Sequence, residues 1–163
     1  MTVCYNLVMI TVNGILESID PDTLKDDELE LVLTETDPAD PSRGWLPLYR
    51  FEMRVDNRLA GRIYMRIGDT HDIRAFRGHI GYAVEPDYRG HHYAERSCRL
   101  LFSIARDHGL STIWITCNPG NMASRRTCER LGATLVEIAP IPEGSDLYEA
   151  GECECCRYRI DLI

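Results

Sequence analysis

The chain has 163 residues, of which 44% are apolar and 27% charged, and its formal net charge is −8. This size and composition indicate one folded domain and argue against a disordered chain. No apolar run approaches the roughly 20 residues of a membrane-spanning helix, and the acidic balance argues against generic nucleic-acid binding. We therefore expect neither a membrane nor a nucleic acid as partner.

The N-terminal part divides at an acidic, turn-rich stretch, residues 20–28. Residues 1–25 are interpreted as an N-terminal extension, either a strand or a loosely attached segment, and residues 26–163 as the folded domain. The first residues are apolar but have neither a basic start nor a clear cleavage site, so no signal peptide is expected.

The next segments predict three antiparallel strands. Residues 28–34 alternate polar and apolar side chains, which is typical of a strand. Three prolines and a glycine make 36–47 a loop. The alternation returns at 49–55, and a third strand is expected at 62–67. The sequence DNRLAG between these two predicts the turn of a hairpin.

The second half predicts alternating strands and helices. In chain order they are a strand, a helix, a strand, a helix and two strands, at 79–84, 93–108, 112–116, 121–131, 133–139 and 156–162. Gly109 and Gly132 end the helices. The first strand–helix–strand step should be a right-handed parallel crossover. The fold class is therefore α/β, a mixed, mostly antiparallel central sheet with a parallel β-α-β core and helices on both faces.

Positive charge is concentrated in the crossover. Residues 74–130 carry 9 basic and 5 acidic side chains, against 7 and 14 in residues 1–73 and 2 and 7 in residues 131–163. The middle segment is thus the natural place for an anionic ligand. The alternative is that arginine is simply frequent, since every basic residue except Lys25 is an arginine.

The segment VEPDYRGHHYA, residues 84–94, joins the first strand of the crossover to its helix. A glycine-containing turn before a helix leaves several N–H groups without acceptors, and the helix dipole adds partial positive charge, so such a turn binds phosphate. Arg89, Arg96, His91 and His92 add positive potential. The spacing matches neither G-x-G-x-x-G nor the P-loop, which argues against a dinucleotide or ATP site.

This segment resembles the coenzyme A signature of the GNAT acetyltransferases, Arg/Gln-x-x-Gly-x-Gly/Ala, with Arg89 and Ala94 in the outer positions. The resemblance implies that acetyl-CoA is the cosubstrate. It also implies that the strand before the segment splays from the next strand, with the pantetheine arm in the gap. The implied contacts are main-chain groups of Ala83 and Val84 for the arm, and Arg89, Gly90, His91, His92, Tyr93 and Ala94 for the pyrophosphate.

His92 departs from the pattern, because a glycine is usual there. Glycine permits a positive φ, and histidine tolerates one better than most residues do. The N–H donors of the turn would therefore remain. The alternative interpretation is that His91 and His92 are only solvent-facing loop residues.

A second segment, NPGNMASRRTCERLG at 118–132, resembles the family's Asn-x-x-Asn-x-x-Ser…Leu-Gly pattern. Asn121 is either the N-cap of the following helix or a coenzyme A contact. Ser124 would face the cofactor by analogy. The two segments together cover 79–132, and the strands on both sides fit the same fold. The chain is therefore identified as a GNAT member, from a bacterial subgroup without an assigned substrate.

Acetyl transfer needs a polarised thioester carbonyl and a neutral amine. A main-chain N–H near Val84 could polarise the carbonyl. A carboxylate or a histidine could take the amine proton. Glu85 and His79 are the nearest candidates in sequence and Glu52 is a further one, although each taken singly is more often structural. His79 and Tyr82 should point to opposite faces of their strand, so only one faces the cofactor.

Many GNAT enzymes have a tyrosine at the position of Cys128, as the acid that protonates the leaving thiolate. Cys128 could donate a proton itself, although a small helix residue facing the core is the favoured interpretation. The reaction can also proceed without a general acid, because a thiol with a pKa of about 8.5 is a good leaving group near neutral pH.

The seven cysteines are odd in number and no export signal accompanies them, so free thiols in the cytoplasm are expected. Cys153, Cys155 and Cys156 suggest zinc, but structural zinc usually needs two ligand pairs, and no such pairing is present. A strand with small apolar thiols fits better, and we expect no metal site.

Two functions remain open. The first is transfer of an acetyl group from acetyl-CoA to a primary amine, on a small molecule or a peptide, by direct attack in a ternary complex. The alternative is a degenerate GNAT domain that binds coenzyme A or a protein partner without turnover. The acidic flanks weakly favour a cationic acceptor. A homodimer is possible, as the common default for oligomers.

Overall fold

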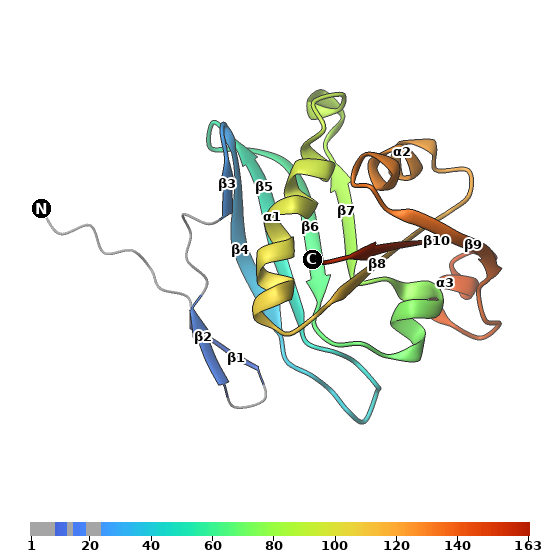
Figure 1. Ribbon diagram of the computed structural model, residues 1–163. Coiled ribbons are helices and arrows are strands. Elements are labelled where there is room, and N and C mark those ends of the chain that lie inside the picture. The colour runs from blue at the N-terminus through green and yellow to red at the C-terminus, as the bar shows by residue number, and fades with distance from the viewer. Residues whose placement is uncertain (1–8, 13–14, 19–23) are drawn as a thin grey trace, which may run out of the picture.

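The computed structural model describes residues 9–12, 15–18 and 24–163 (Figure 1). In the N-terminal segment, β1 (Met9–Val12) and β2 (Ile15–Ser18) pair as an antiparallel two-stranded sheet. The other residues of the interpreted extension up to 23 lie outside the described residues. The division between an extension and a domain stays a prediction.

A five-stranded antiparallel sheet forms the first half of the domain. Its strands follow in chain order, β3 (Lys25–Asp26), β4 (Leu29–Asp37), β5 (Leu48–Val55), β6 (Arg58–Arg66) and β7 (Ile80–Val84). The turn between β5 and β6 is shorter than predicted. Asp56 and Asn57 alone form it, both with a positive φ, as a tight primed hairpin turn requires. The third strand therefore begins at Arg58 and not at Arg62.

The second half supplies the helices and a three-stranded sheet. The elements are α1 (Tyr93–Asp107), β8 (Thr112–Cys117), α2 (Met122–Arg130), β9 (Thr134–Pro140), α3 (Asp146–Glu149) and β10 (Glu154–Asp161). The strand order is β8-β10-β9, with both pairings antiparallel. The predicted mixed α/β fold with a mostly antiparallel sheet is confirmed. Two short helical turns, at 73–77 and 86–88, lie between the predicted elements.

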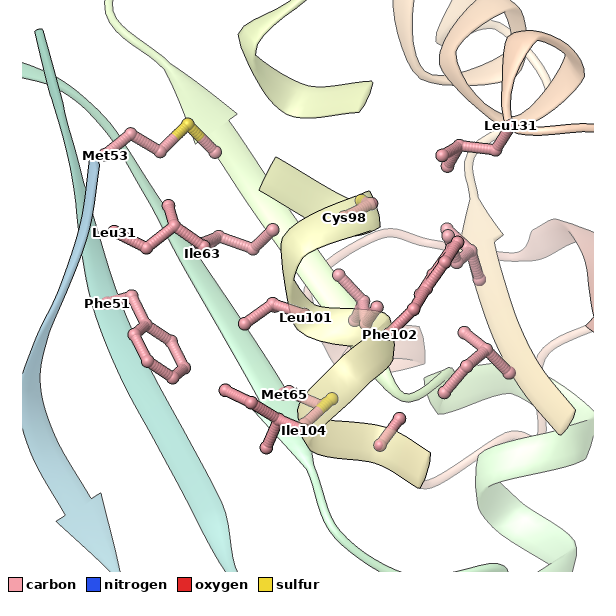
Figure 2. Packing of buried hydrophobic residues seen from close by; sticks show 14 of the residues in the cluster. Leu31, Phe51, Met53, Ile63, Met65, Cys98, Leu101, Phe102, Ile104 and Leu131 are labelled. Atoms are coloured by element: carbon pink, nitrogen blue, oxygen red, sulfur yellow. The ribbon is translucent and has the colours of Figure 1, made fainter. Parts of the chain in front are cut away.

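The main core lies between α1 and the five-stranded sheet. Leu101 and Ile104 of α1 point toward Phe51, Ile63 and Met65 of the sheet, and all five are almost fully buried (Figure 2). The apolar face of α1 follows the helical spacing seen in the sequence. This packing fixes the direction of α1, and with it the turn that precedes the helix.

Helices cover both faces of the three-stranded part. Cys128 and Leu131 of α2 join the main core on the side of α1. On the opposite face, Phe76 of the 73–77 turn packs with Ile141 and Cys155, next to α3. Within the described ranges, no helix has the length and the apolar character needed to cross a bilayer.

Candidate active site

The two sheets meet at β7 and β8 and then separate. The His79 N–H donates to the Trp114 carbonyl oxygen at 2.7 Å, just before β7 begins. Beyond this contact the strands belong to different sheets, and a cavity of about 330 Å³ opens between them. Residues 80–83 line one wall and residues 115–117 the other, and Asn121 and Ser124, at the start of α2, also line the cavity. The splayed strands implied by the family resemblance are therefore present.

His79 holds this junction together. Its side chain is fully buried, and its Nδ1 accepts the Trp114 N–H at 2.9 Å. The other nitrogen, Nε2, therefore carries the proton and donates to the Gly68 carbonyl oxygen at 3.0 Å. Burial lowers the pKa of His79 below its usual value. Because both ring nitrogens are engaged, this geometry gives His79 a structural role in place of the proposed role as base.

The hydrogen-bonding register of β7 shows which main-chain groups face the cavity. The Glu85 N–H donates to Ala60 O, and the Arg66 N–H donates to His79 O. Hydrogen-bonded positions alternate along an antiparallel pair, so the main-chain N–H and carbonyl groups of Ala83 point toward β6. The N–H groups of Tyr82 and Val84 consequently point toward the gap. Ala83 itself lines the cavity.

The turn between β7 and α1 has the shape of an anion site. Gly90 has a φ of 87°, and His92, the residue just before α1, is left-handed with φ 61° and ψ 23°. Across the described residues, no acceptor is found for the N–H groups of Gly90 to Ala94, and no side chain caps the helix. Arg89 stabilises the turn, because its Nε–H donates to the Val84 carbonyl oxygen at 3.2 Å.

Arg96 does not add its charge to this turn. Its guanidinium contacts Asp26 Oδ2 at 2.6 Å and Glu28 Oε1 at 2.8 Å, which ties α1 to the region around β3. The hydrogen bond from Arg96 lowers the pKa of Glu28 to about 2. The positive potential that the sequence assigns to Arg96 is thus largely compensated. His91 stacks on Tyr93, with ring centroids 5.5 Å apart.

The left-handed backbone of His92 leads to a prediction. We expect His92→Gly to retain acetyl-CoA affinity within a few-fold and to keep or raise the free energy of unfolding, by up to about 1 kcal/mol, because glycine removes the Cβ strain of that conformation. Thermal unfolding with and without acetyl-CoA measures both. His91→Gly is the matched control, since His91 lacks a positive φ and should lose stability. A loss of affinity in His92→Gly alone would instead assign a direct phosphate contact to the imidazole.

The start of α2 lines part of the cavity. Asn121 caps the helix, with its Oδ1 accepting the Ser124 N–H at 3.1 Å, and both residues line the cavity. The Ser124 hydroxyl lies 2.9 Å from the Tyr82 hydroxyl. Of the two β7-region residues that parity placed on opposite faces, Tyr82 is therefore the one at the cavity. The sequence alone could not select Tyr82, because the selection depends on its contact with Ser124, 42 residues later in the chain.

Cys128 lies behind this wall. It is fully buried, packs in the main core and does not line the cavity, and burial raises its pKa to about 12. The cavity-lining thiol is Cys117, and burial raises its pKa to about 11. Among the C-terminal cysteines, Cys155 packs in the second cluster and Cys156 in the main core. Within the described residues, no group of three or more ligand side chains is placed to hold a metal.

A second cavity, of about 420 Å³, adjoins the first on the strands β4 to β6. The two cavities share Arg62 and Tyr64. Glu52 lines the second cavity, and its carboxylate is held by Arg54 at 2.7 Å. Glu85 lies past the end of β7, 3.4 Å from Arg62, and lines neither cavity.

A model of the Acetyltransferase (GNAT) family matches residues 13–133, and the chain belongs to that family. No curated protein matches.

Solved structures of acetyltransferases share the fold. The microcin C7 self-immunity acetyltransferase MccE, in complex with acetyl-CoA and AMP, is 20% identical with a TM-score of 0.53, over 71% of this chain and 61% of that one. The ribosomal L7/L12 α-N-protein acetyltransferase RimL, in complex with coenzyme A, is 20% identical with a TM-score of 0.54, over 74% and 64%. An acetyltransferase from Salmonella typhimurium that modifies the N-terminal serine of L7/L12 is 20% identical with a TM-score of 0.54, over 75% and 67%. The chain spans less than two thirds of the first two.

Proposed function

We propose that this protein transfers the acetyl group of acetyl-CoA to a primary amine, on a small molecule or a peptide, by direct attack in a ternary complex. The observations that carry the proposal are the cavity between the separated strands β7 and β8 and the turn of unpaired N–H groups that follows β7 directly in the chain. A long thiol arm fits the gap between the strands, and a pyrophosphate fits the turn. MccE and RimL, which share the fold, bind acetyl-CoA and coenzyme A.

The proposed binding mode assigns the pyrophosphate to the N–H groups of residues 90–94, with Arg89 holding the turn in shape. The pantetheine arm follows the free edge of β7, where the N–H groups of Tyr82 and Val84 point into the gap. Either N–H could polarise the thioester carbonyl, which develops negative charge as the amine attacks. Asn121 and Ser124 form the far wall of this site.

We propose the second cavity as the acceptor site, because it adjoins the first through Arg62 and Tyr64. Glu52 is then the better-placed general base. It lies opposite Arg62 on the neighbouring strand, and Arg62 in turn lies opposite Ala83, so one row of the sheet leads from the carboxylate to the cofactor gap. Glu85 is the alternative base.

Binding of acetyl-CoA is the first test. A ligand at about 100 times its dissociation constant stabilises a protein by about 2.7 kcal/mol, so we expect the melting temperature to rise by roughly 5–10 °C. Thiol release with a panel of primary amines should follow. Stabilisation without thiol release would favour the alternative, a domain that binds coenzyme A without turnover. No stabilisation at millimolar acetyl-CoA would contradict the transferase and would leave the form of the alternative in which the domain binds a protein partner.

We also propose a cytoplasmic location. Six cysteines lie among the described residues and all are free thiols, as is typical of a reducing compartment. The possible homodimer stays a proposal as well, and analytical ultracentrifugation with and without acetyl-CoA tests it.

A further inference from the structure

One hydroxyl group beside the start of α2 lines the cavity between β7 and β8 without a role in the proposed binding mode. It belongs to Tyr82, whose side chain extends from β7 to α2 and meets the Ser124 hydroxyl at 2.9 Å. Both residues line the cavity. Cys128, one helical turn beyond Ser124, is fully buried and does not line it. The cavity-lining donors nearest to α2 are therefore the Tyr82 and Ser124 hydroxyls, with the Cys117 thiol on the opposite wall.

The direction of the cofactor brings its sulfur past Tyr82. With the pyrophosphate on residues 90–94, the pantetheine arm enters at the C-terminal end of β7 and runs toward the start of the strand. It passes Val84 first and reaches Tyr82 deeper in the gap. In the proposed binding mode, the reacting end of the arm would lie in the part of the cavity lined by Tyr82 and Ser124.

Either hydroxyl can be the donor in the hydrogen bond between Tyr82 and Ser124, and the hydroxyl that accepts keeps its own proton for another partner. If Ser124 donates to the phenol oxygen, the Tyr82 O–H has only a long contact of 3.5 Å with the Ser124 carbonyl oxygen and can turn from it into the gap. Burial raises the pKa of Tyr82 far above its usual value, so the phenol stays protonated at every working pH. A phenol this weakly acidic does not surrender its proton to a thiolate, but it remains a hydrogen-bond donor.

We propose that the Tyr82 hydroxyl, oriented by Ser124, donates a hydrogen bond to the coenzyme A sulfur as the thioester breaks. This inference rests on the proposed function. The amine nitrogen forms the new C–N bond, the C–S bond breaks, and its electron pair goes to sulfur. Tyr82 keeps its proton and stabilises the thiolate, as a preorganised donor stabilises an oxyanion. The amine proton goes to the base, and the thiolate takes a proton from water in the open cavity.

Tyr82→Phe tests the proposal, because it removes the hydroxyl and retains the ring. A hydrogen bond to a charged group is typically lost at about a 10- to 100-fold cost, so kcat should fall by that factor while the acetyl-CoA KM stays within a few-fold. Across a series of acetyl thioesters, the variant should depend more steeply on the pKa of the leaving thiol. Tyr49→Phe is the matched control, since it also removes a buried, hydrogen-bonded phenol oxygen but lies outside both cavities.

A second readout does not need turnover. The thiol of bound coenzyme A can be titrated by the ultraviolet absorbance of its thiolate. Its pKa should be about one unit higher in Tyr82→Phe than in the unaltered protein and in Tyr49→Phe. Equal thiol pKa values in all three proteins, or an unchanged leaving-group dependence, would overturn the inference. Absence of thiol release from the unaltered protein with every amine would instead contradict the proposed function. The thiol titration would still show whether the Tyr82 hydroxyl contacts the coenzyme A sulfur.

Discussion

Replacing His79 with alanine should lower the free energy of unfolding by about 3–5 kcal/mol, because the change leaves one buried and one half-buried main-chain group without partners and removes a fully buried ring. These are the Trp114 N–H and the Gly68 carbonyl oxygen, which the two ring nitrogens now satisfy. An unsatisfied buried group costs about 1–3 kcal/mol, the half-buried Gly68 carbonyl costs less, and the lost ring volume adds to this. Equilibrium unfolding in urea measures the difference.

The matched control is His71→Ala, whose side chain is 89% exposed and should change stability by less than about 0.5 kcal/mol. The pH dependence supplies a second readout of the same site. The folded-state pKa of His79 is lowered, so below the unfolded value of about 6.5 the unfolded chain binds a proton that the folded protein does not. Stability should fall as the pH drops from about 7 to 5.

His79→Ala should weaken this dependence on pH. The ion-paired carboxylates cannot imitate it, because the pKa of Glu28 is lowered to about 2 and its contribution is lost only in more acidic solution. A variant as stable as the unaltered protein, with the same slope between pH 5 and 7, would show that His79 does not join the two sheets.

The sequence predicts most of this fold, because periodicity is a local property. The helix expected at 93–108 is found at 93–107, and the one expected at 121–131 is found at 122–130. The error at the β5–β6 turn has a physical reason. Gly61 suggests a longer turn, but it is a strand residue, and a Cβ there would lie 2.5 Å from the Ala83 carbonyl oxygen. Glycine is needed here because β6 and β7 approach closely at this point. Such a contact between strands cannot be read from the local sequence pattern.

The candidate site was less predictable, because its chemistry depends on contacts between distant segments. Parity left His79 and Tyr82 as equal candidates for the cofactor side, and only the positions of Trp114 and Ser124 separate them. Arg96 lies close to the phosphate-binding segment in sequence, but its partners are about 70 residues earlier in the chain. By contrast, the left-handed His92 follows directly from the local pattern, since glycine is usual at that position.

Glu52→Gln should lower kcat by about 10²- to 10⁴-fold, the usual contribution of a general base, with acetyl-CoA affinity unchanged. The amide keeps the size of the side chain and removes the group that accepts the amine proton. The second cavity would keep its shape, although the ion pair with Arg54 would be lost. Steady-state thiol release with a saturating amine measures the change, and thermal unfolding with acetyl-CoA checks that the cofactor site is intact.

Two further variants make this assignment specific. Glu30→Gln removes a carboxylate from β4, opposite Arg54 and outside both cavities, and should leave kcat within a few-fold. Glu85→Gln tests the other candidate, which contacts Arg62 but lines neither cavity. If Glu52 is the base, its variant should lose far more activity than the Glu85 variant. The reverse order would place the amine at the C-terminal end of β7, on the opposite side of Arg62 from the second cavity, and would move the acceptor site with it.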